Sequence, residues 1–333
     1  MIDDERRNEV EDELRRRAKK SFDTGMAAFR RGDYSEVLSA LDGALKLCQD
    51  ISGSECGQAD CLHGSGVALG EMGDLRGALG CYEQALVLYR EVPGNECGQA
   101  DCLYNCGVAL GGLGDSRGAL ECYERALILF QGVPDSGCTQ AECLFNCGAM
   151  LNELGDWRGA LGCFERSLTL FQGVPGSERE QADCLYGSGA MLSELGDYWG
   201  ALGCFDRALV LLGKSIVEAG WVEAERTGAR CLQGIGDCLV ELNEAIIPSH
   251  FARALEVFRR PKHVDHTKND QASCLRSIGE GRSATGDLDG AVEAYQQAQD
   301  LYKQVGQPER AAEINVPLAR ALKRKAAAID SIF

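Results

Sequence analysis

The stretch ADCLYNCGVALGGLGDSRGALECYERALILF, residues 100–130, decides the fold of this chain. Its first half has apolar or small residues at 102, 103, 106, 107, 109, 110 and 113, the spacing of one helix face. Its second half shows the same kind of pattern from Ala119 to Phe130, after a Gly114-Asp115 pair. The stretch therefore predicts two helices joined by a tight turn, which we call the A helix and the B helix.

This hairpin recurs along the chain with a period of 41 residues. Gly-Asp pairs begin at residues 32, 73, 114, 155 and 196, and a further copy starts at Gln271. A fixed period in this range indicates stacked repeats. We predict units at 18–58, 59–99, 100–140, 141–181, 182–228, 229–271 and 272–305, of which 229–271 is divergent. A charged helical extension at 1–17 precedes them, and a capping helix and tail at 306–333 follow.

Small residues return at fixed positions inside the unit. With Ala100 counted as position 1, the clear copies carry glycine at position 8, alanine at 27 (serine in the unit at 141–181) and an aromatic residue at 24. Position 20 is alanine, except for Val37 in the first unit, where Leu41 also replaces the aromatic residue. A glycine inside a helix costs roughly 1 kcal/mol relative to alanine, so its return predicts a close crossing of two helices.

This combination of residues resembles the tetratricopeptide repeat family. The unit is longer than the common repeat of about 34 residues, and it is similar to the long repeats of kinesin light chain and Pins-like adaptors. We expect the surplus residues in a longer B helix and its following loop. The resemblance implies an all-α, right-handed α-solenoid of about seven repeats with N- and C-terminal capping helices. It also implies a concave side, lined by A helices, that binds extended peptides.

Composition limits the classes of partner. The chain has 333 residues, 45% of them hydrophobic, and a formal net charge of −17. Such a charge would repel nucleic acid and anionic lipid, so a basic protein segment is the expected partner. No apolar run is long enough for membrane insertion, and the N-terminus lacks the apolar core of a secretory signal, so we expect a cytoplasmic protein.

The 17 cysteines fall mainly at four positions of the unit. Positions 3, 7 and 23 lie on the packed stripes, where a free cysteine acts as a small apolar residue. Cys56, Cys97 and Cys138 at position 39 are expected in the loop and are the more reactive candidates. The alternative is a four-thiolate metal site or a redox sensor built from Cys102, Cys106, Cys143 and Cys147.

Candidate binding residues remain at positions 2, 5 and 6 of the A helices, outside the packing stripe. They form an acidic row beside an aromatic row, with asparagines between them, and we expect them to line the peptide groove. They are Asp60 and His63; Asp101, Tyr104 and Asn105; Glu142, Phe145 and Asn146; and Asp183 and Tyr186.

Carboxylates repeated once per unit would attract Lys or Arg, and rings would add cation–π contact. The sequence therefore predicts a non-catalytic adaptor that holds a net-basic peptide or helix and needs no cofactor or metal. No phosphate-binding loop, nucleophile elbow or acid–base pair is present in the sequence. One alternative is an architectural subunit of a multiprotein complex that docks through the convex face or the divergent 243–271 region. The other is the thiol-based function above.

Overall fold

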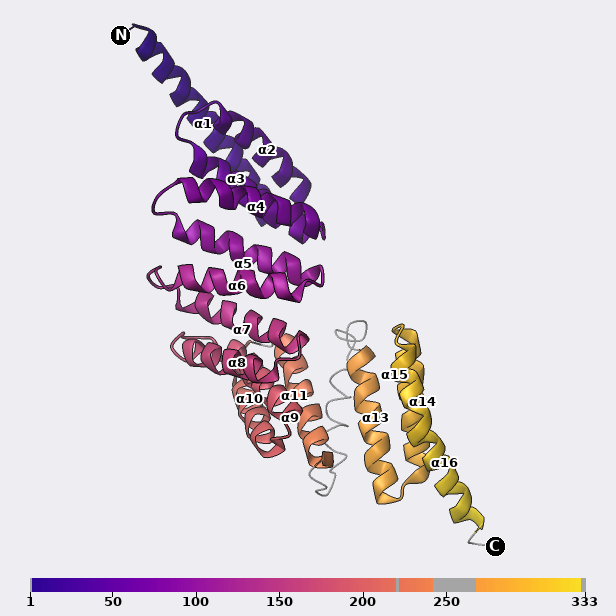
Figure 1. The fold of residues 1–333 in the computed structure, drawn as a ribbon. Helices are drawn as coiled ribbons and strands as arrows, with labels where there is room; N and C mark the ends of the chain where they lie inside the picture. Colours follow the sequence, from indigo (N-terminus) through magenta and orange to yellow (C-terminus); the bar gives the residue numbers. More distant parts are fainter. Residues whose placement is uncertain (1, 220–221, 242–267, 331–333) are drawn as a thin grey trace. The chain divides into compact units, whose positions relative to one another are not determined.

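The fold was taken from a computed structural model, which describes residues 2–219, 222–241 and 268–330 (Figure 1). Every regular element in these ranges is a helix, which confirms the all-α class. The helices are α1 (Ile2–Arg30), α2 (Tyr34–Gln49), α3 (Glu55–Glu71), α4 (Leu75–Glu91), α5 (Glu96–Gly112), α6 (Ser116–Phe130), α7 (Gly137–Glu153), α8 (Trp157–Phe171), α9 (Glu178–Glu194), α10 (Tyr198–Ala219), α11 (Val222–Glu241), α13 (Lys268–Thr285), α14 (Leu288–Gln304), α15 (Pro308–Glu313) and α16 (Asn315–Asp330).

The chain forms two compact units, residues 1–163 and 164–333, whose boundary lies inside α8. In the first unit each helix from α1 to α6 packs against the next one in the chain (Figure 1). In the second unit α9 packs on α10 and α10 on α11, and α13 pairs with α14, which α15 and α16 cover. Consecutive helical hairpins of this kind make an all-α solenoid.

The Gly-Asp pair builds the turn between the A and B helices, as predicted. Gly73 has a φ of +82°, and the backbone N–H of Asp74 donates to the carbonyl of Leu69 at 2.9 Å. The Asp74 carboxylate then accepts from the N–H of Gly77 at 2.9 Å and caps the start of α4. Glycine is favoured before the aspartate because other residues rarely adopt a positive φ.

Close helix crossings lie at position 8, again as predicted. A methyl group on Gly66 would lie 2.6 Å from Cε1 of Tyr82, and one on Gly107 would lie 2.7 Å from Cε1 of Tyr123. The ring at position 24 therefore packs directly on the backbone of the A helix. Any side chain at position 8 would push the two helices of a hairpin apart.

The surplus residues of the long unit were predicted in a longer B helix and its following loop, and the structure also places some of them in the A helix. The A helices α3, α5, α7 and α9 have 17 residues each. The B helices vary, with 15 residues in α6 and α8, 17 in α4 and α14, and 22 in α10. The A helices gain a first turn, in which acids such as Glu55 and Glu96 suit the positive end of the helix dipole. The loop before α7 is closed by the Ser136 hydroxyl, which donates to the Phe130 carbonyl at 2.6 Å.

The helices at the two ends of the chain extend beyond the repeats. The charged extension at 1–17 continues without a break into the first A helix, because α1 runs from Ile2 to Arg30. The C-terminal segment is divided between the short α15 and the longer α16. Most of the divergent 243–271 region lies outside the described residues, and so does any docking role predicted for it.

Candidate protein-binding face

The predicted groove residues occupy the A helices, on a surface that we call the A-helix face. In the first unit it carries Asp60 and His63 on α3, Asp101, Tyr104 and Asn105 on α5, and Glu142, Phe145 and Asn146 on α7. In the second unit Asp183 and Tyr186 lie on α9. Asp60 is exposed, and the other nine residues are half-buried, so all ten can be reached from solvent.

Successive A helices are tied together across this face. Asn105 Nδ2 lies 2.9 Å from His63 Nε2, and Asn146 Nδ2 donates to the Tyr104 hydroxyl at 3.2 Å. Each bond joins position 6 of one repeat to position 5 of the repeat before it. The ladder of side chains is therefore fixed before any partner binds, a feature that repeat spacing alone did not indicate.

Aromatic rings support the same rows from beneath. Tyr104 packs edge to face on Tyr123 with a centroid separation of 5.7 Å, and His63 packs on Tyr82 at the same distance. In the second unit Tyr186 packs on Phe205 at 6.0 Å. The position-5 rings thus rest on the position-24 rings of their own hairpins, which holds their orientation.

The position-2 acids fall into different electrostatic environments. Asp60 accepts a hydrogen bond of 2.5 Å from the Tyr89 hydroxyl of its own repeat. Asp183 accepts from Thr227 at 2.8 Å and lies 3.8 Å from Arg179. These two carboxylates are already engaged within the chain, which the sequence did not reveal.

Asp101 has a different set of neighbours. Tyr89, which donates to Asp60, stands at position 31 of its repeat, and the equivalent residue in the repeat of Asp101 is Phe130, which has no hydroxyl. The Asp101 carboxylate accepts a weak hydrogen bond from Cys97 Sγ at 3.8 Å. Burial raises the pKa of the Asp101 carboxyl, and the nearby His63 ring opposes this effect only in part. Burial also lowers the pKa of His63, so this ring is neutral near pH 7. Asp101 is therefore a partly desolvated carboxylate that a cation would stabilise.

The cysteines are mostly packing residues, as predicted. The position-3 thiols are all buried, and burial raises the pKa of Cys102 and of Cys143 to about 12. Cys106 and Cys147 at position 7 are also buried, whereas the position-23 thiols are half-buried. Within the ranges that the structure describes, no group of three or more His, Cys, Asp or Glu residues is arranged to hold a metal ion.

The position-39 cysteines were predicted to lie in the loop, and this is wrong. Cys56, Cys97 and Cys138 lie in the first turn of α3, α5 and α7, because the A helices begin earlier than the apolar pattern does. Cys97 and Cys138 are nevertheless exposed. They remain the thiols most accessible to reagents among these three.

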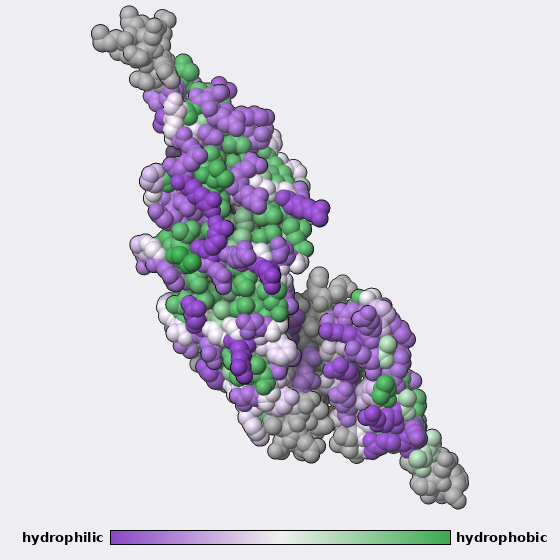
Figure 2. Space-filling model, viewed as in Figure 1, coloured by the Kyte–Doolittle hydropathy of each residue, from purple (hydrophilic) through white to green (hydrophobic). Residues whose placement is uncertain are grey.

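Apolar side chains are exposed elsewhere on the first unit. Figure 2 shows green, hydrophobic surface beside purple, hydrophilic surface on its visible face. Met72 and Leu113, at the A–B turns, are 53% and 42% exposed, and Ile128 on α6 is 66% exposed. Exposed apolar side chains that lie singly are common on protein surfaces, so these residues do not by themselves identify a binding site.

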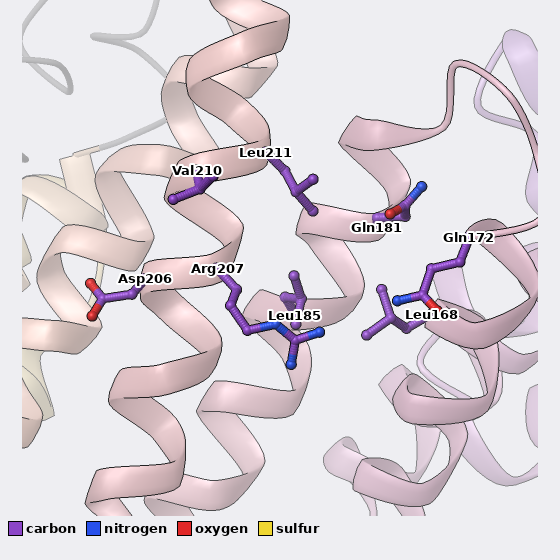
Figure 3. Close-up of a pocket in the computed structure, with 8 residues that line it drawn as sticks. All are labelled: Leu168, Gln172, Gln181, Leu185, Asp206, Arg207, Val210 and Leu211. Atoms are coloured by element: carbon purple, nitrogen blue, oxygen red, sulfur yellow. The ribbon is translucent and has the colours of Figure 1, made fainter.

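A pocket of about 340 Å³ lies in the second unit, beside α10 (Figure 3). Three leucines and Val210 line it together with Gln172, Gln181, Asp206 and Arg207, and the side chains of Asp206 and Arg207 point in different directions. Val210 is 64% exposed. The residues that line this pocket lie outside the A-helix face, and the sequence analysis did not predict them as site residues.

Residues 62–131 and 140–212 match the family model of the tetratricopeptide repeat. This part of the chain is therefore built from tetratricopeptide repeats. Its helices also superpose on solved structures of such repeats, and these similarities concern the fold. None of the curated proteins compared with the chain matches its sequence.

Three solved structures illustrate the tetratricopeptide fold of the chain. The apo form of RapI has 16% identity and a TM-score of 0.64, with 87% of this chain and 99% of RapI covered. A tetratricopeptide repeat protein from Parabacteroides merdae has 16% identity and a TM-score of 0.54, with coverage of 92% and 99%. A putative kinesin light chain from Podosopora anserina has 13% identity and a TM-score of 0.51, with coverage of 60% and 96%.

Tetratricopeptide repeats indicate a scaffold for protein–protein interaction, and so a protein partner. Among the described residues, no helix has both the length and the apolar content needed to cross a membrane. The likeness to Pins-like adaptors stays a prediction.

Proposed function

We propose that this tetratricopeptide protein is a non-catalytic adaptor whose A-helix face holds a net-basic, extended or helical segment of a partner protein. Asp101 and Glu142 select positive charge in the first unit, with Tyr104 and Phe145 as apolar anchors. In the second unit, considered by itself, Tyr186 offers a similar apolar anchor, whereas Asp183 is already held by Thr227 and Arg179. The partner contributes Lys or Arg side chains, as part of a multiprotein complex.

The observation that supports this proposal best is the environment of Asp101. Its carboxylate is half-buried and its pKa is raised by burial, and the Tyr89-type donor that binds Asp60 is replaced by Phe130. A Lys or Arg side chain of the partner would offset the desolvation that disfavours the ionised form of this carboxyl. Charge-assisted hydrogen bonds in such settings contribute about 1.5–3 kcal/mol.

The neighbouring side chains suit a cation with an aliphatic stem. Tyr104 lies one helical turn from Asp101, and its ring orientation is fixed by Tyr123 and by the hydrogen bond from Asn146. A Lys or Arg stem can pack on this ring while its charged end reaches the carboxylate. Because the ladder is already formed, little side-chain entropy is lost when the segment binds.

A charge-reversal experiment tests the proposal. Asp101→Lys with Glu142→Lys changes the face, whereas Glu83→Lys with Glu124→Lys makes the same change in net charge at exposed positions on the B helices α4 and α6. The immobilised wild type and both variants are used to capture proteins from a cell extract at low salt. Quantitative mass spectrometry then compares the captured sets, and circular dichroism verifies that the helices are intact.

We expect the face variant to lose a set of proteins, by more than tenfold, that the control variant retains. Peptides from the lost proteins should bind the wild type through net-basic segments, with an affinity that falls as salt is raised. If the face variant unfolds, Asp101→Asn with Glu142→Gln replaces it, with an expected loss of about threefold. Identical captured sets for the face and control variants would refute the use of this face.

A further inference from the structure

A pocket of about 230 Å³ lies in the first repeat, and we call it the first-repeat pocket. Its floor and walls come from α1, the end of α2 and the start of α3, with Phe22, Ala44, Cys48, Ile51 and Cys61 among its apolar lining. Its margin carries three charged side chains, Arg15 and Lys19 from α1 and Asp60 from α3. It is independent of the A-helix face at Asp101 and Glu142, which the proposed function uses.

The pocket exists because one side chain of the repeat is small. Position 31 is aromatic or leucine in the other described repeats, and these side chains are buried: Tyr89, Phe130, Phe171, Leu212 and Tyr302. In the first repeat the same position is Cys48. A thiol fills far less space than a ring, so the volume that the ring occupies elsewhere stays open here.

The second repeat shows what the site normally holds. A methyl group on Gly98 would lie 2.9 Å from Cε1 of Tyr89, so the ring fills the space up to the backbone of α5. The equivalent methyl on Gly57 would lie 3.5 Å from Cys48 Sγ. The first-repeat pocket is therefore shaped by the fold itself to receive an aromatic ring.

The charges at the margin are also changed in the first repeat. Lys19 stands at position 2, where Asp60, Asp101 and Glu142 stand in the next three repeats. Arg15 lies one period of 41 residues before Cys56 and so occupies the equivalent position. Its guanidinium lies 3.8 Å from the Glu11 carboxylate. Asp60, on the opposite margin, already accepts the Tyr89 hydroxyl. Two cations beside an apolar pocket favour an anionic group next to the ring.

We propose that the first-repeat pocket binds an aromatic side chain of a partner protein whose neighbouring residue or terminus carries a carboxylate. The ring takes the place that Tyr89 and Phe130 hold in their own repeats, and the carboxylate lies against Arg15 and Lys19. The chemistry recognised here is thus acidic and aromatic, opposite in charge to the segment proposed for the A-helix face. One adaptor would distinguish two parts of a partner, or two partners, by charge.

Small probes test this without knowledge of the partner. The probes are 3-phenylpropionate and phenethylamine, which have similar size and opposite charge, titrated into the full chain by ligand-observed NMR. We expect 3-phenylpropionate to bind with a Kd of roughly 1–10 mM, as suits so few atoms. It should bind roughly fivefold more tightly than the amine at low salt.

Variants assign the binding to the pocket. Cys48→Phe fills it as the other repeats do and should abolish binding; Cys48→Leu is the second filler, since Leu212 already occupies that position in another repeat. Lys19→Glu should reverse the preference between the two probes. Lys20→Glu is the matched control, because Lys20 is the next residue of α1, is exposed, and does not line the first-repeat pocket.

Binding that both fillers abolish, and whose charge preference follows Lys19 but not Lys20, supports the proposal. Equal binding of both probes, binding that survives both fillers, or no binding by folded wild type overturns it. None of these outcomes depends on Asp101 or Glu142, so failure here leaves the A-helix face to its own test.

Discussion

The first and second repeats share one backbone design but fill it differently. Both turn through a glycine of positive φ, Gly32 at +74° and Gly73 at +82°, followed by an aspartate that caps the B helix. Among the differences between their interiors, two concern aromatic rings: Leu41 and Cys48 in the first repeat replace Tyr82 and Tyr89 in the second. The turn and the small residues thus fix the hairpin, whereas the rings decide how full it is and whether a pocket remains.

Giving position 31 of the second repeat the residue that the first repeat has there should produce the largest change in stability. Tyr89→Cys removes a buried ring and its hydrogen bond to Asp60. It should lower the free energy of unfolding by about 3 kcal/mol, as is usual for loss of a buried aromatic side chain. Urea denaturation followed by circular dichroism measures this loss.

The reverse change, Cys48→Phe, serves as the counterpart. It should raise the free energy of unfolding by about 1 kcal/mol, because the space for the ring is already present. A loss of stability in both directions would mean that the two slots are not equivalent in shape.

A methyl group added at position 8 should affect the stability of the two repeats differently. Gly66→Ala brings its new carbon 2.6 Å from a rigid Tyr82 ring, whereas Gly25→Ala meets the Leu41 side chain at 3.2 Å. We expect Gly66→Ala to cost about 2 kcal/mol through overpacking. Gly25→Ala should be nearly neutral, because Leu41 can shift and alanine favours the helix by roughly 1 kcal/mol. Equal unfolding midpoints for the two variants would contradict the role assigned to the ring.

The predictable part of the fold is the part set by local chemistry. The Gly-Asp turn, the close crossing at position 8 and the burial of Cys102 and Cys143 all follow from periodicity and side-chain size. The early start of the A helices did not follow, because it depends on acids and a loop hydroxyl rather than on an apolar stripe. Glu55 and Glu96 before the stripe were the available signal.

The residues of the A-helix face were predictable as a set, but their pairings within the chain were not. The phase of the repeat correctly placed Asp101, Tyr104 and Asn105 on a solvent-accessible part of α5. It could not show that the Tyr89 hydroxyl donates a hydrogen bond to Asp60, because these residues are 29 positions apart and lie on two helices. The replacement of an aromatic residue by Cys48 was visible in the sequence, but its consequence depends on the three helices that surround it.

The smallest effect compares the acids at position 2 of the second and third repeats. Asp101→Asn removes a charge that burial disfavours, so it should raise the free energy of unfolding at pH 7 by less than about 0.5 kcal/mol. Asp60→Asn should instead lower it by up to about 1 kcal/mol, because the Tyr89 hydroxyl then donates to a neutral amide. Denaturation of both variants at pH 7 measures the opposite signs.

The dependence on pH identifies the cause of the Asp101 effect. A carboxyl whose pKa is raised in the folded state binds its proton more tightly there than in the unfolded chain, so its stabilising contribution is present at low pH. This contribution is lost as the pH rises through the folded pKa. The advantage of Asp101→Asn should therefore shrink as the pH falls toward the ordinary aspartate value of 3.8, where wild-type Asp101 also becomes neutral. An advantage that stayed constant from pH 7 to pH 4 would show that packing, rather than the desolvated charge, distinguishes Asp101 from Asp60.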